Sequence, residues 1–168
     1  MFDIQKFARS DVTKKYNGRR RLSGNYGKVY IGGIEIFEIS SFEAKITVDR
    51  DEVIIGISKD SKVTGLTGEG SVTVKKVSTR GFNKYLTNQQ KGYDERFTII
   101  AEISDPDTIN GQEERVKLEN VWFNEFDLVK FEKGAVVEAE IPFGFTPEDV
   151  TYEKAITVSD SEFAHESH

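Results

Sequence analysis

Residues 112–145 read QEERVKLENVWFNEFDLVKFEKGAVVEAEIPFGF, and this stretch decides the fold class. It predicts two long strands, over residues 115–126 and 134–141, joined at Lys133-Gly134. In the first strand, Val116, Leu118 and Trp122 would share one face, with Lys117, Glu119, Val121 and Phe123 on the other. In the second, Ala135, Val137, Ala139 and Ile141 alternate with Val136, Glu138 and Glu140. Alternation of period two is typical of a strand with one buried and one exposed face, so the chain is predicted to be mainly β.

Both strands are longer than the usual five or six residues, and long strands need partners on both edges. An uncovered edge is a template for unwanted pairing with another chain. A protein can hide its edges by closing a barrel or by adding its strands to a neighbour's sheet. We expect the second solution here.

At 168 residues and 19.0 kDa the chain has the size of one domain. A domain of this size buries roughly 70% of its unfolded surface, so it needs neither disulfides nor metals to hold a core. Cysteine is absent, which excludes disulfides, zinc–thiolate sites and thiol nucleophiles. No apolar run has membrane-spanning length, and the first residues lack the apolar core of a signal peptide. The chain is therefore expected to be soluble and made in the cytoplasm.

Charge is distributed unevenly along the chain. Residues 1–28 hold eight Lys and Arg against two Asp, a net charge of +6, whereas the other 140 residues carry −12. The basic cluster KKYNGRRR, residues 14–21, would suit nucleic acid on its own, but an acidic body repels DNA on approach. Docking on the acidic surface of an identical neighbour is therefore favoured. A solvated, disordered arm is the alternative for the isolated monomer.

Residues 1–25 lack periodicity and are expected to form an extended arm. Strands over residues 28–31 and 34–39 flank Gly32-Gly33, which suits a tight hairpin because both positions tolerate positive φ. The alternation slips by one residue at Ser40-Ser41, which indicates a bulge. Beyond it, Phe42, Ala44, Ile46 and Val48 would share one face, with Glu43, Lys45, Thr47 and Asp49 on the other.

Residues 50–70, RDEVIIGISKDSKVTGLTGEG, place a short apolar run, residues 53–57, between charged flanks. One interpretation of this run is a core strand. The other is a long protruding hairpin whose apolar tip is covered by another molecule, because monomers rarely leave such a patch exposed. From the residues alone, both interpretations stay open.

A further strand is expected over residues 71–77, followed by a helix that ends near Gly92. The residues at helical spacing are Phe82, Tyr85, Leu86 and Gln89, and the candidate caps are Ser78 and Thr79. Such a helix would cover one open face of a sheet. Residues 93–103 alternate as a strand, whereas residues 150–158 show little pattern.

The residues offer little for catalysis. Both histidines, His165 and His168, lie in the last four residues, and a flexible end is a poor cage for a metal. No Ser-His or Cys-His nucleophile system can form outside that end. The sequence TGLTGEG, residues 64–70, lacks the GK[ST] of a phosphate loop. We therefore expect no enzyme, no catalytic or metal-binding residues and no cofactor.

The order of these elements resembles a known family over roughly residues 26–155. The segments that carry the resemblance are GKVYIGGIEIFEISSFEAKITVDRDEV, TGLTGEGSVTVKKVSTRGF, the helix, FTIIAEISDP, ERVKLENVWFNEFDLVKFEKG and AEIPFGFTPED. Together they look like the tail tube proteins of contractile phage tails and tailocins, the PBSX-like defective prophage group in particular. The resemblance implies a β-sandwich or barrel-like fold with one flanking helix, in which a long protruding hairpin and the termini make contacts between subunits and rings. The long N-terminal arm expected from the residues is less typical of that family. It also implies hexameric rings stacked into a hollow tube through which phage DNA passes.

The alternating faces and the resemblance together give expectations for sites and partners. Carboxylates repel a DNA backbone that lysines would hold, so the lumen wall is expected to include Glu43, Glu119, Glu138 and Glu140. Contacts between subunits and rings are expected at Lys14, Lys15, Arg19, Arg20, Arg21, Val53, Ile54, Ile55 and Ile57. The implied partners are further copies of the chain and the tail sheath, tape measure, baseplate and tail terminator proteins, with no membrane, in a virion tail or a tailocin particle.

The expected boundaries are an arm over residues 1–25, a tail tube β domain over residues 26–158 and a flexible tail over residues 159–168. Three alternatives stay open at this point. They are the tube of a type VI secretion-like apparatus, a tailocin tube without DNA, and a monomeric β-barrel module that binds a small ligand or carbohydrate.

Overall fold

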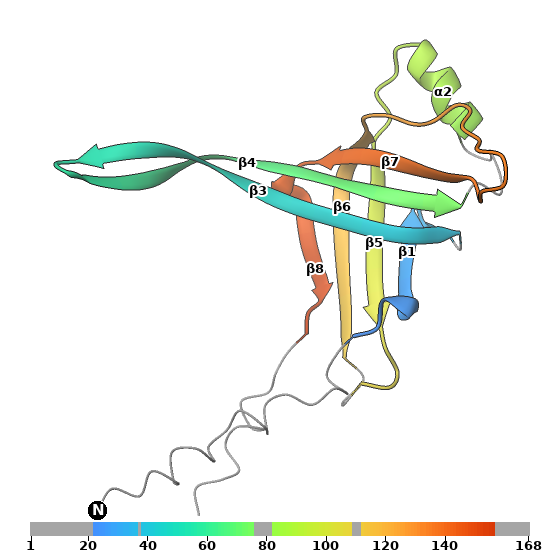
Figure 1. Cartoon of the computed structure of the whole chain (residues 1–168), viewed down its shortest axis with the longest axis horizontal. Coiled ribbons are helices and arrows are strands. Elements are labelled where there is room, and N and C mark those ends of the chain that lie inside the picture. The colour runs from blue at the N-terminus through green and yellow to red at the C-terminus, as the bar shows by residue number, and fades with distance from the viewer. Residues whose placement is uncertain (1–21, 37, 76–81, 109–111, 157–168) are drawn as a thin grey trace, which may run out of the picture.

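The computed structural model describes residues 22–36, 38–75, 82–108 and 112–156, and Figure 1 shows their arrangement. The strands are β1 (Gly27–Ile31), β2 (Ile34–Glu35), β3 (Ile39–Ile55), β4 (Ser58–Lys75), β5 (Phe97–Ser104), β6 (Glu113–Phe123), β7 (Glu138–Phe145) and β8 (Val150–Lys154). The helix is α2 (Phe82–Gln90), and two short 3-10 turns are η3 (Gly24–Tyr26) and η4 (Pro147–Asp149). The described part of the chain is therefore mainly β with one α-helix, as predicted.

The strands form two layers that share β6. In the first layer β2, β1, β5, β6 and β8 pair in that order, and in the second layer β7, β4 and β3 pair in that order. Every pairing is antiparallel. The layers join where the last two residues of β6, Trp122 and Phe123, pair with Gly144 and Phe143 of β7. The long strands of the second layer cross those of the first at a steep angle (Figure 1), so the architecture is an orthogonally packed β-sandwich.

The core lies between the two layers and contains apolar side chains from both. Its buried members are Val29, Val72, Ile99, Leu118, Val121, Ile141, Phe143 and Phe145. Phe143 is fully buried, and its ring stacks on Phe42 of β3 with centroids 5.7 Å apart. Burying a side chain of this size contributes about 1.5–3 kcal/mol to stability, so the aromatic side chains between the layers are a major source of the protein's stability.

The predicted turn and bulge near the start of the described chain are both confirmed. Gly32 and Gly33 connect β1 and β2 with φ of 59° and 83°, the left-handed region in which a side chain would be strained. The register of β3 against β4 shifts between Ile39 and Ser41, which leaves Ser40 as the extra residue. β2 is shorter than predicted, because it ends at Glu35 and β3 starts separately at Ile39.

The two strands predicted over residues 115–126 and 134–141 differ from the structure in two ways. First, β6 ends at Phe123 and β7 begins at Glu138, so residues 124–137 form a longer loop than the predicted junction at Lys133-Gly134. Second, the prediction placed Val121 opposite Leu118, but both are buried in the same core. Asn120 has a φ of 54°, and the register of β6 against β5 shifts by one residue at this point. This bulge reverses the alternation.

The helix and the last strand also correct the predictions. Helix α2 packs through Tyr85, whose ring lies 5.6 Å from Phe97 and 5.7 Å from Phe123. It therefore covers the ends of β5 and β6 rather than an open sheet face (Figure 1). Gly92 has a φ of 81° just after the helix, as expected for its end. β8, which pairs with β6, lies in residues for which the sequence predicted no element.

The hairpin of β3 and β4 extends far beyond the body of the protein (Figure 1). Its strands have 17 and 18 residues and turn at Gly56-Ile57. The core-strand interpretation of residues 53–57 is therefore wrong, and these residues form the tip of a protruding hairpin. That another molecule covers this tip stays a prediction. β3 is the edge strand of its layer, and no strand in the described part of the chain covers its outer edge.

Glycines of the second layer make room for neighbouring aromatic rings. A Cβ on Gly70 would lie 2.5 Å from Cζ of Phe143 and would also meet the carbonyl oxygen of Glu43. A Cβ on Gly144 would lie 2.6 Å from Cε2 of Trp122. Real Cβ atoms do not approach so closely, so these glycines let the rings lie flat against the strands.

We expect Gly70→Ala to lower the free energy of unfolding by about 1–3 kcal/mol, because the buried Phe143 ring would have to leave its position. Denaturant unfolding of the dilute chain measures this. Gly24→Ala is the matched control, since nothing lies within 4 Å of a Cβ at that position. Equal unfolding midpoints for both variants and the unchanged chain would contradict this account of the core.

Candidate functional site

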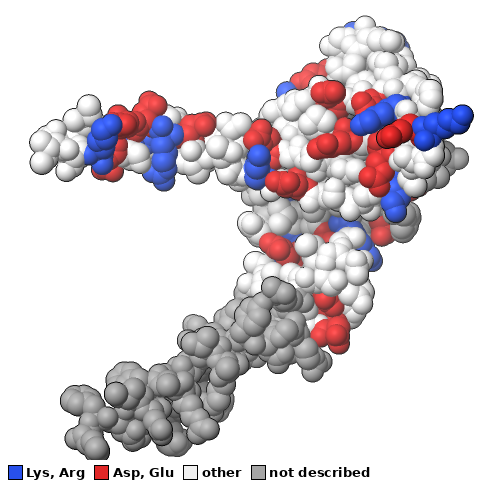
Figure 2. All heavy atoms as spheres, viewed as in Figure 1, with Lys and Arg blue, Asp and Glu red and all other residues white. Residues whose placement is uncertain are grey.

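One face of the second layer is acidic and points away from the core. Strand register places Glu43 of β3 opposite Ser71 of β4, and Thr73 of β4 opposite Glu140 of β7. Core side chains such as Phe42 and Val72 occupy the alternate positions. The carboxylates on this outward face, here called the acidic face, are Glu43, Asp49, Glu69, Glu138 and Glu140. Figure 2 shows acidic side chains gathered over this layer, with fewer basic ones among them.

Contacts on the acidic face are few and exposed. Lys45 Nζ lies 3.2 Å from Glu69 Oε1, and both side chains are more than half exposed. The Ser40 hydroxyl, in the bulge of β3, donates to Glu138 Oε1 over 2.9 Å. Exposed pairs of this kind contribute about 0–1 kcal/mol each. The negative charge of the face is therefore not needed to hold the fold together.

The structure brings together three of the four carboxylates predicted for a lumen wall. Glu43, Glu138 and Glu140 share the acidic face. Glu119 lies instead on β6 in the first layer, where its carboxylate is 2.6 Å from Lys117 Nζ. The hydrogen bond to Glu119 raises the pKa of Lys117 above its ordinary value. Glu119 is thus part of a separate ion pair on the other layer.

The tip of the hairpin is an exposed apolar surface. Its residues, here called the hairpin tip, are Val53, Ile54, Ile55, Gly56 and Ile57. Ile54 is 72% exposed and Ile57 is fully exposed. Charged pairs lie just behind the tip, with Lys59 Nζ 2.8 Å from Glu52 Oε1, and Figure 2 shows the uncharged end beyond these bands of charge. An apolar end on a charged stem is typical of a segment that is buried in an assembly.

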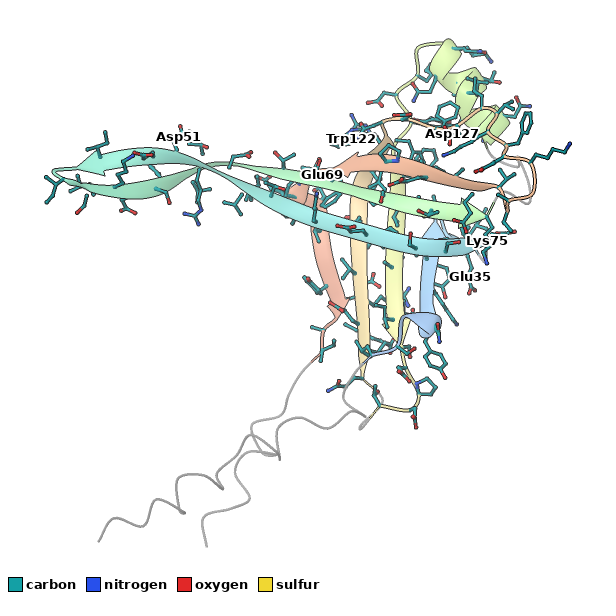
Figure 3. All side chains as sticks on the ribbon, in the orientation of Figure 1. Glu35, Asp51, Glu69, Lys75, Trp122 and Asp127 are labelled. Carbon is teal, nitrogen blue, oxygen red and sulfur yellow. The ribbon has the colours of Figure 1, made fainter. Side chains whose placement is uncertain are left out.

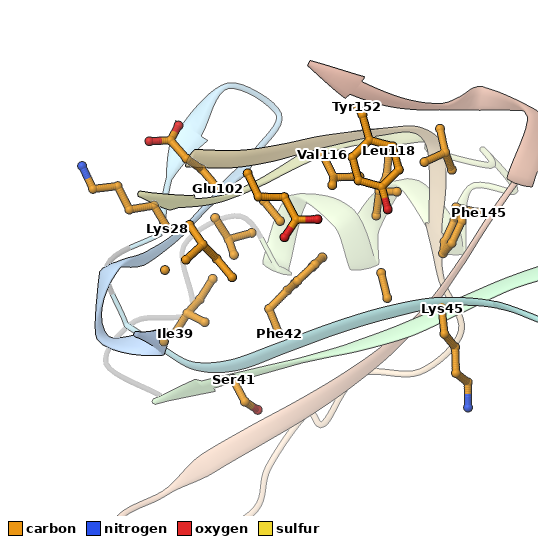
Figure 4. A pocket seen from close by; sticks show the side chains of 18 of the residues that line it. Lys28, Ile39, Ser41, Phe42, Lys45, Glu102, Val116, Leu118, Phe145 and Tyr152 are labelled. Atoms are coloured by element: carbon orange, nitrogen blue, oxygen red, sulfur yellow. The ribbon is translucent and has the colours of Figure 1, made fainter. Parts of the chain in front are cut away.

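An apolar cleft of about 670 Å³ opens between the two layers under the base of the hairpin. Phe42 of β3 and Val116 of β6 face each other across it, with Tyr152 of β8 at one side (Figure 4). Lys45 points away from the cleft (Figure 4), and Glu102 is bound to the guanidinium of Arg115 over 3.3 Å. The cleft thus continues the apolar core and brings no set of reactive groups together.

The remaining chemical signals are sparse. No group of three or more metal-ligating side chains is found in the described residues. Among those residues there is likewise no helix that is both long and apolar enough to span a bilayer. The two histidines and the basic residues predicted to make subunit contacts, Lys14, Lys15, Arg19, Arg20 and Arg21, lie outside the described residues.

Sequence reasoning missed two features of this surface. The free edge of β3 could not be recognised, because pairing order is set by contacts between distant segments. The cleft between the layers was missed for the same reason. The only local signal of an edge was the alternation of β3 itself, whose outward residues are polar along its first half.

Comparison with known proteins gives consistent matches. A family model described as phage tail tube protein matches residues 14–152. Two proteins of Bacillus subtilis (strain 168) are each 32% identical over 132 residues, which is 77% of this chain and 89% of each relative. They are the phage-like element PBSX protein XkdM and the uncharacterized protein YqbM.

Solved structures of low sequence identity share the fold. A chain of the extended PVC sheath-tube complex, from an extracellular contractile injection system, has a TM-score of 0.65 at 12% identity. The match covers 87% of this chain and 100% of that one. Hcp1 from Flavobacterium johnsoniae has a TM-score of 0.53 at 9% identity, covering 80% and 99%. The fold of the described residues is thus shared with these structures.

The free energy of unfolding of the double variant Glu43→Gln/Glu140→Gln is expected to lie within about 1 kcal/mol of that of the unchanged chain, because both side chains are exposed surface groups. Glu102→Gln is the contrasting variant. Its largely buried side chain pairs with Arg115, so its loss should cost about 1.5–3 kcal/mol. Urea unfolding compares the two, and a larger loss for the acidic-face variant would show that this face is structural.

Proposed function

The chain belongs to the phage tail tube protein family, and on that premise we propose that it is the structural subunit of a contractile tail tube. In this proposal six copies form a ring and rings stack into a hollow tube. The chain acts as a building block and not as an enzyme. The parent particle is a phage tail or a tailocin, and the protein is made in the bacterial cytoplasm before assembly.

The free edge of β3 is the observation that carries this proposal. A strand of 17 residues with one unpaired edge is a template for pairing with another chain. At the other end of the layer, β7 pairs with β6 only through Gly144 and Phe143, which leaves residues 138–141 open on that side among the described residues. Edge-to-edge pairing of identical layers would continue the sheet around a ring.

The acidic face gives the ring its role as a conduit. If the second layers line the lumen, the carboxylates of Glu43, Glu138 and Glu140 form part of its wall. Duplex DNA carries dense negative charge and binds strongly to surfaces that neutralise its phosphates. A wall of carboxylates repels the backbone and lets it slide. Glu119 lies on the other layer and is left out of this wall.

Further contacts complete the assembly. The hairpin tip would be buried against another subunit, which removes its apolar side chains from water. The basic cluster of residues 14–21 would meet the acidic surface of a neighbour. Tail sheath, tape measure, baseplate and tail terminator proteins are the other partners of such a tube. A tube in a DNA-free injection particle is the second candidate, favoured by the fold shared with the PVC sheath-tube complex.

Assembly of the purified chain tests the proposal. At rising concentration, with and without isolated baseplates as a nucleus, light scattering and negative-stain microscopy should detect rings of six and then tubes. A monomeric binding module would instead stay monomeric at every concentration. A chain that stays monomeric under every one of these conditions, baseplates included, would refute the proposed function.

Replacing Glu43, Glu138 and Glu140 by Lys should leave tubes intact but make them retain duplex DNA, because each lysine neutralises a phosphate and releases counterions. The measurement is the amount of nuclease-resistant DNA that sediments with tubes. Retention should fall steeply as salt rises.

Glu119→Lys is the control for this charge reversal. DNA bound by tubes of the Glu119→Lys variant should stay sensitive to nuclease. Glu119 lies outside the acidic face, so DNA bound there would not be enclosed in the lumen. If the triple variant protects no more DNA than the Glu119→Lys control, the acidic face does not line the lumen.

A further inference from the structure

A second apolar surface lies on the loop between β6 and β7. Phe131 and Val129 are each 80% exposed, and Val136 is 75% exposed. This surface, here called the loop patch, consists of Leu128, Val129, Phe131 and Val136. Large apolar side chains so exposed on one loop are unusual in a protein that works alone. The patch therefore needs an occupant.

The loop is held in place, so the patch is a fixed surface. The ring of Phe126 lies 5.4 Å from Tyr85 of α2, and the backbone N–H of Asn124 donates to the carbonyl of Pro142 over 3.0 Å. At its other end the loop runs into β7, whose Glu138 pairs with Lys75 of β4. Within the loop a turn forms, in which the N–H of Ala135 donates to the carbonyl of Glu132 over 3.2 Å. With both ends anchored, the apolar side chains between them are presented outward.

The loop patch and the hairpin tip lie at opposite ends of the same layer. Figure 3 labels Asp51 on the projecting hairpin, and Asp127 and Lys75 at the far end of the layer. A single chain therefore cannot bury its own tip on its own patch. Two copies placed head to tail along the layer can do so, and each contact leaves a free tip at one end and a free patch at the other.

The two surfaces also match in chemistry. Both are formed by apolar side chains, and each is bordered by an ion pair that carries both signs. Behind the tip the pair is Glu52 and Lys59 at 2.8 Å, and beside the patch it is Asp127 and Lys130 at 3.8 Å. Neither border is strongly charged overall, so the surfaces can approach without net repulsion.

We propose that the hairpin tip of one copy packs on the loop patch of a copy in the next ring. This rests on the proposed tube and names the acceptor of its stacking contact. The contact is heterologous and does not close on itself, so it propagates as an open stack. Because the same contact is repeated around the ring, each contact can be weak on its own while the stack of rings is stable.

Disulfide trapping tests the contact, and the cysteine-free chain suits it. The double variant Ile55→Cys/Val129→Cys is assembled into tubes, oxidised and run on a non-reducing gel. Disulfides form only when the two Cα atoms lie about 4.4–6.8 Å apart. We expect a ladder of covalent oligomers from the double variant, and only dimers when the two single variants are mixed.

Two other acceptor positions serve as controls for the trapping. Ile34, which is 69% exposed, lies on β2, and Ile46 lines the cleft between the layers. Neither Ile34→Cys nor Ile46→Cys should cross-link when it is combined with Ile55→Cys. If the Ile55→Cys/Val129→Cys variant forms normal tubes but no cross-link, the inference is overturned while the proposed tube function is unaffected. Equal cross-linking by the Ile34→Cys or Ile46→Cys combination overturns it in the same way.

Charge insertion gives an independent measurement. Val129→Asp and Ile57→Asp should each allow single rings to form but prevent the rings from stacking. Ile34→Asp should leave both ring formation and stacking unchanged. Tubes of unchanged length from Val129→Asp overturn the inference. If the unchanged chain forms no tube at all, even on baseplates, both the proposed function and the stacking contact fail.

Discussion

Backbone hydrogen bonding along β3 is the constraint on which the rest of the structure depends. β4 satisfies one edge of this strand over nearly its whole length, and no described strand satisfies the other. Half of its inter-strand N–H and C=O groups therefore depend on water or on another chain. Long open edges normally invite disordered aggregation. In the proposed ring of identical copies the same edge would become the joint, and the protruding hairpin would extend toward the next ring.

The charge of the outward face follows from the same strand register. Because Phe42 and Val72 point into the core, their sequence neighbours Glu43 and Ser71 must point out. A slip of one residue would bury the carboxylates and expose the core. The bulge at Ser40 and the shift between Asp49 and Arg50 fix this register. The strand register therefore sets both the fold and the surface charge, and the proposed anionic wall depends on both.

Local patterns in the sequence predicted the parts of the fold that depend on local rules. Alternation identified most of the strands and Gly32-Gly33 the first turn, whereas the apolar run at residues 53–57 left a core strand and a hairpin tip equally open. The bulge at Asn120 was missed, because one residue with positive φ reverses the faces without changing composition. The layer crossing, the open edge and the loop patch depend on contacts between distant segments. The loop patch also has no periodicity, since its residues lie in irregular backbone.

Amide hydrogen exchange along residues 39–55 tests the central claim most directly. In the free chain, the N–H groups of β3 that face β4 should be protected, while those on the outer edge exchange rapidly. After assembly, the outer-edge amides should become protected as well, together with the tip. If they are already protected in the free chain, or if assembly leaves their exchange unchanged, the edge of β3 is not the joint between subunits.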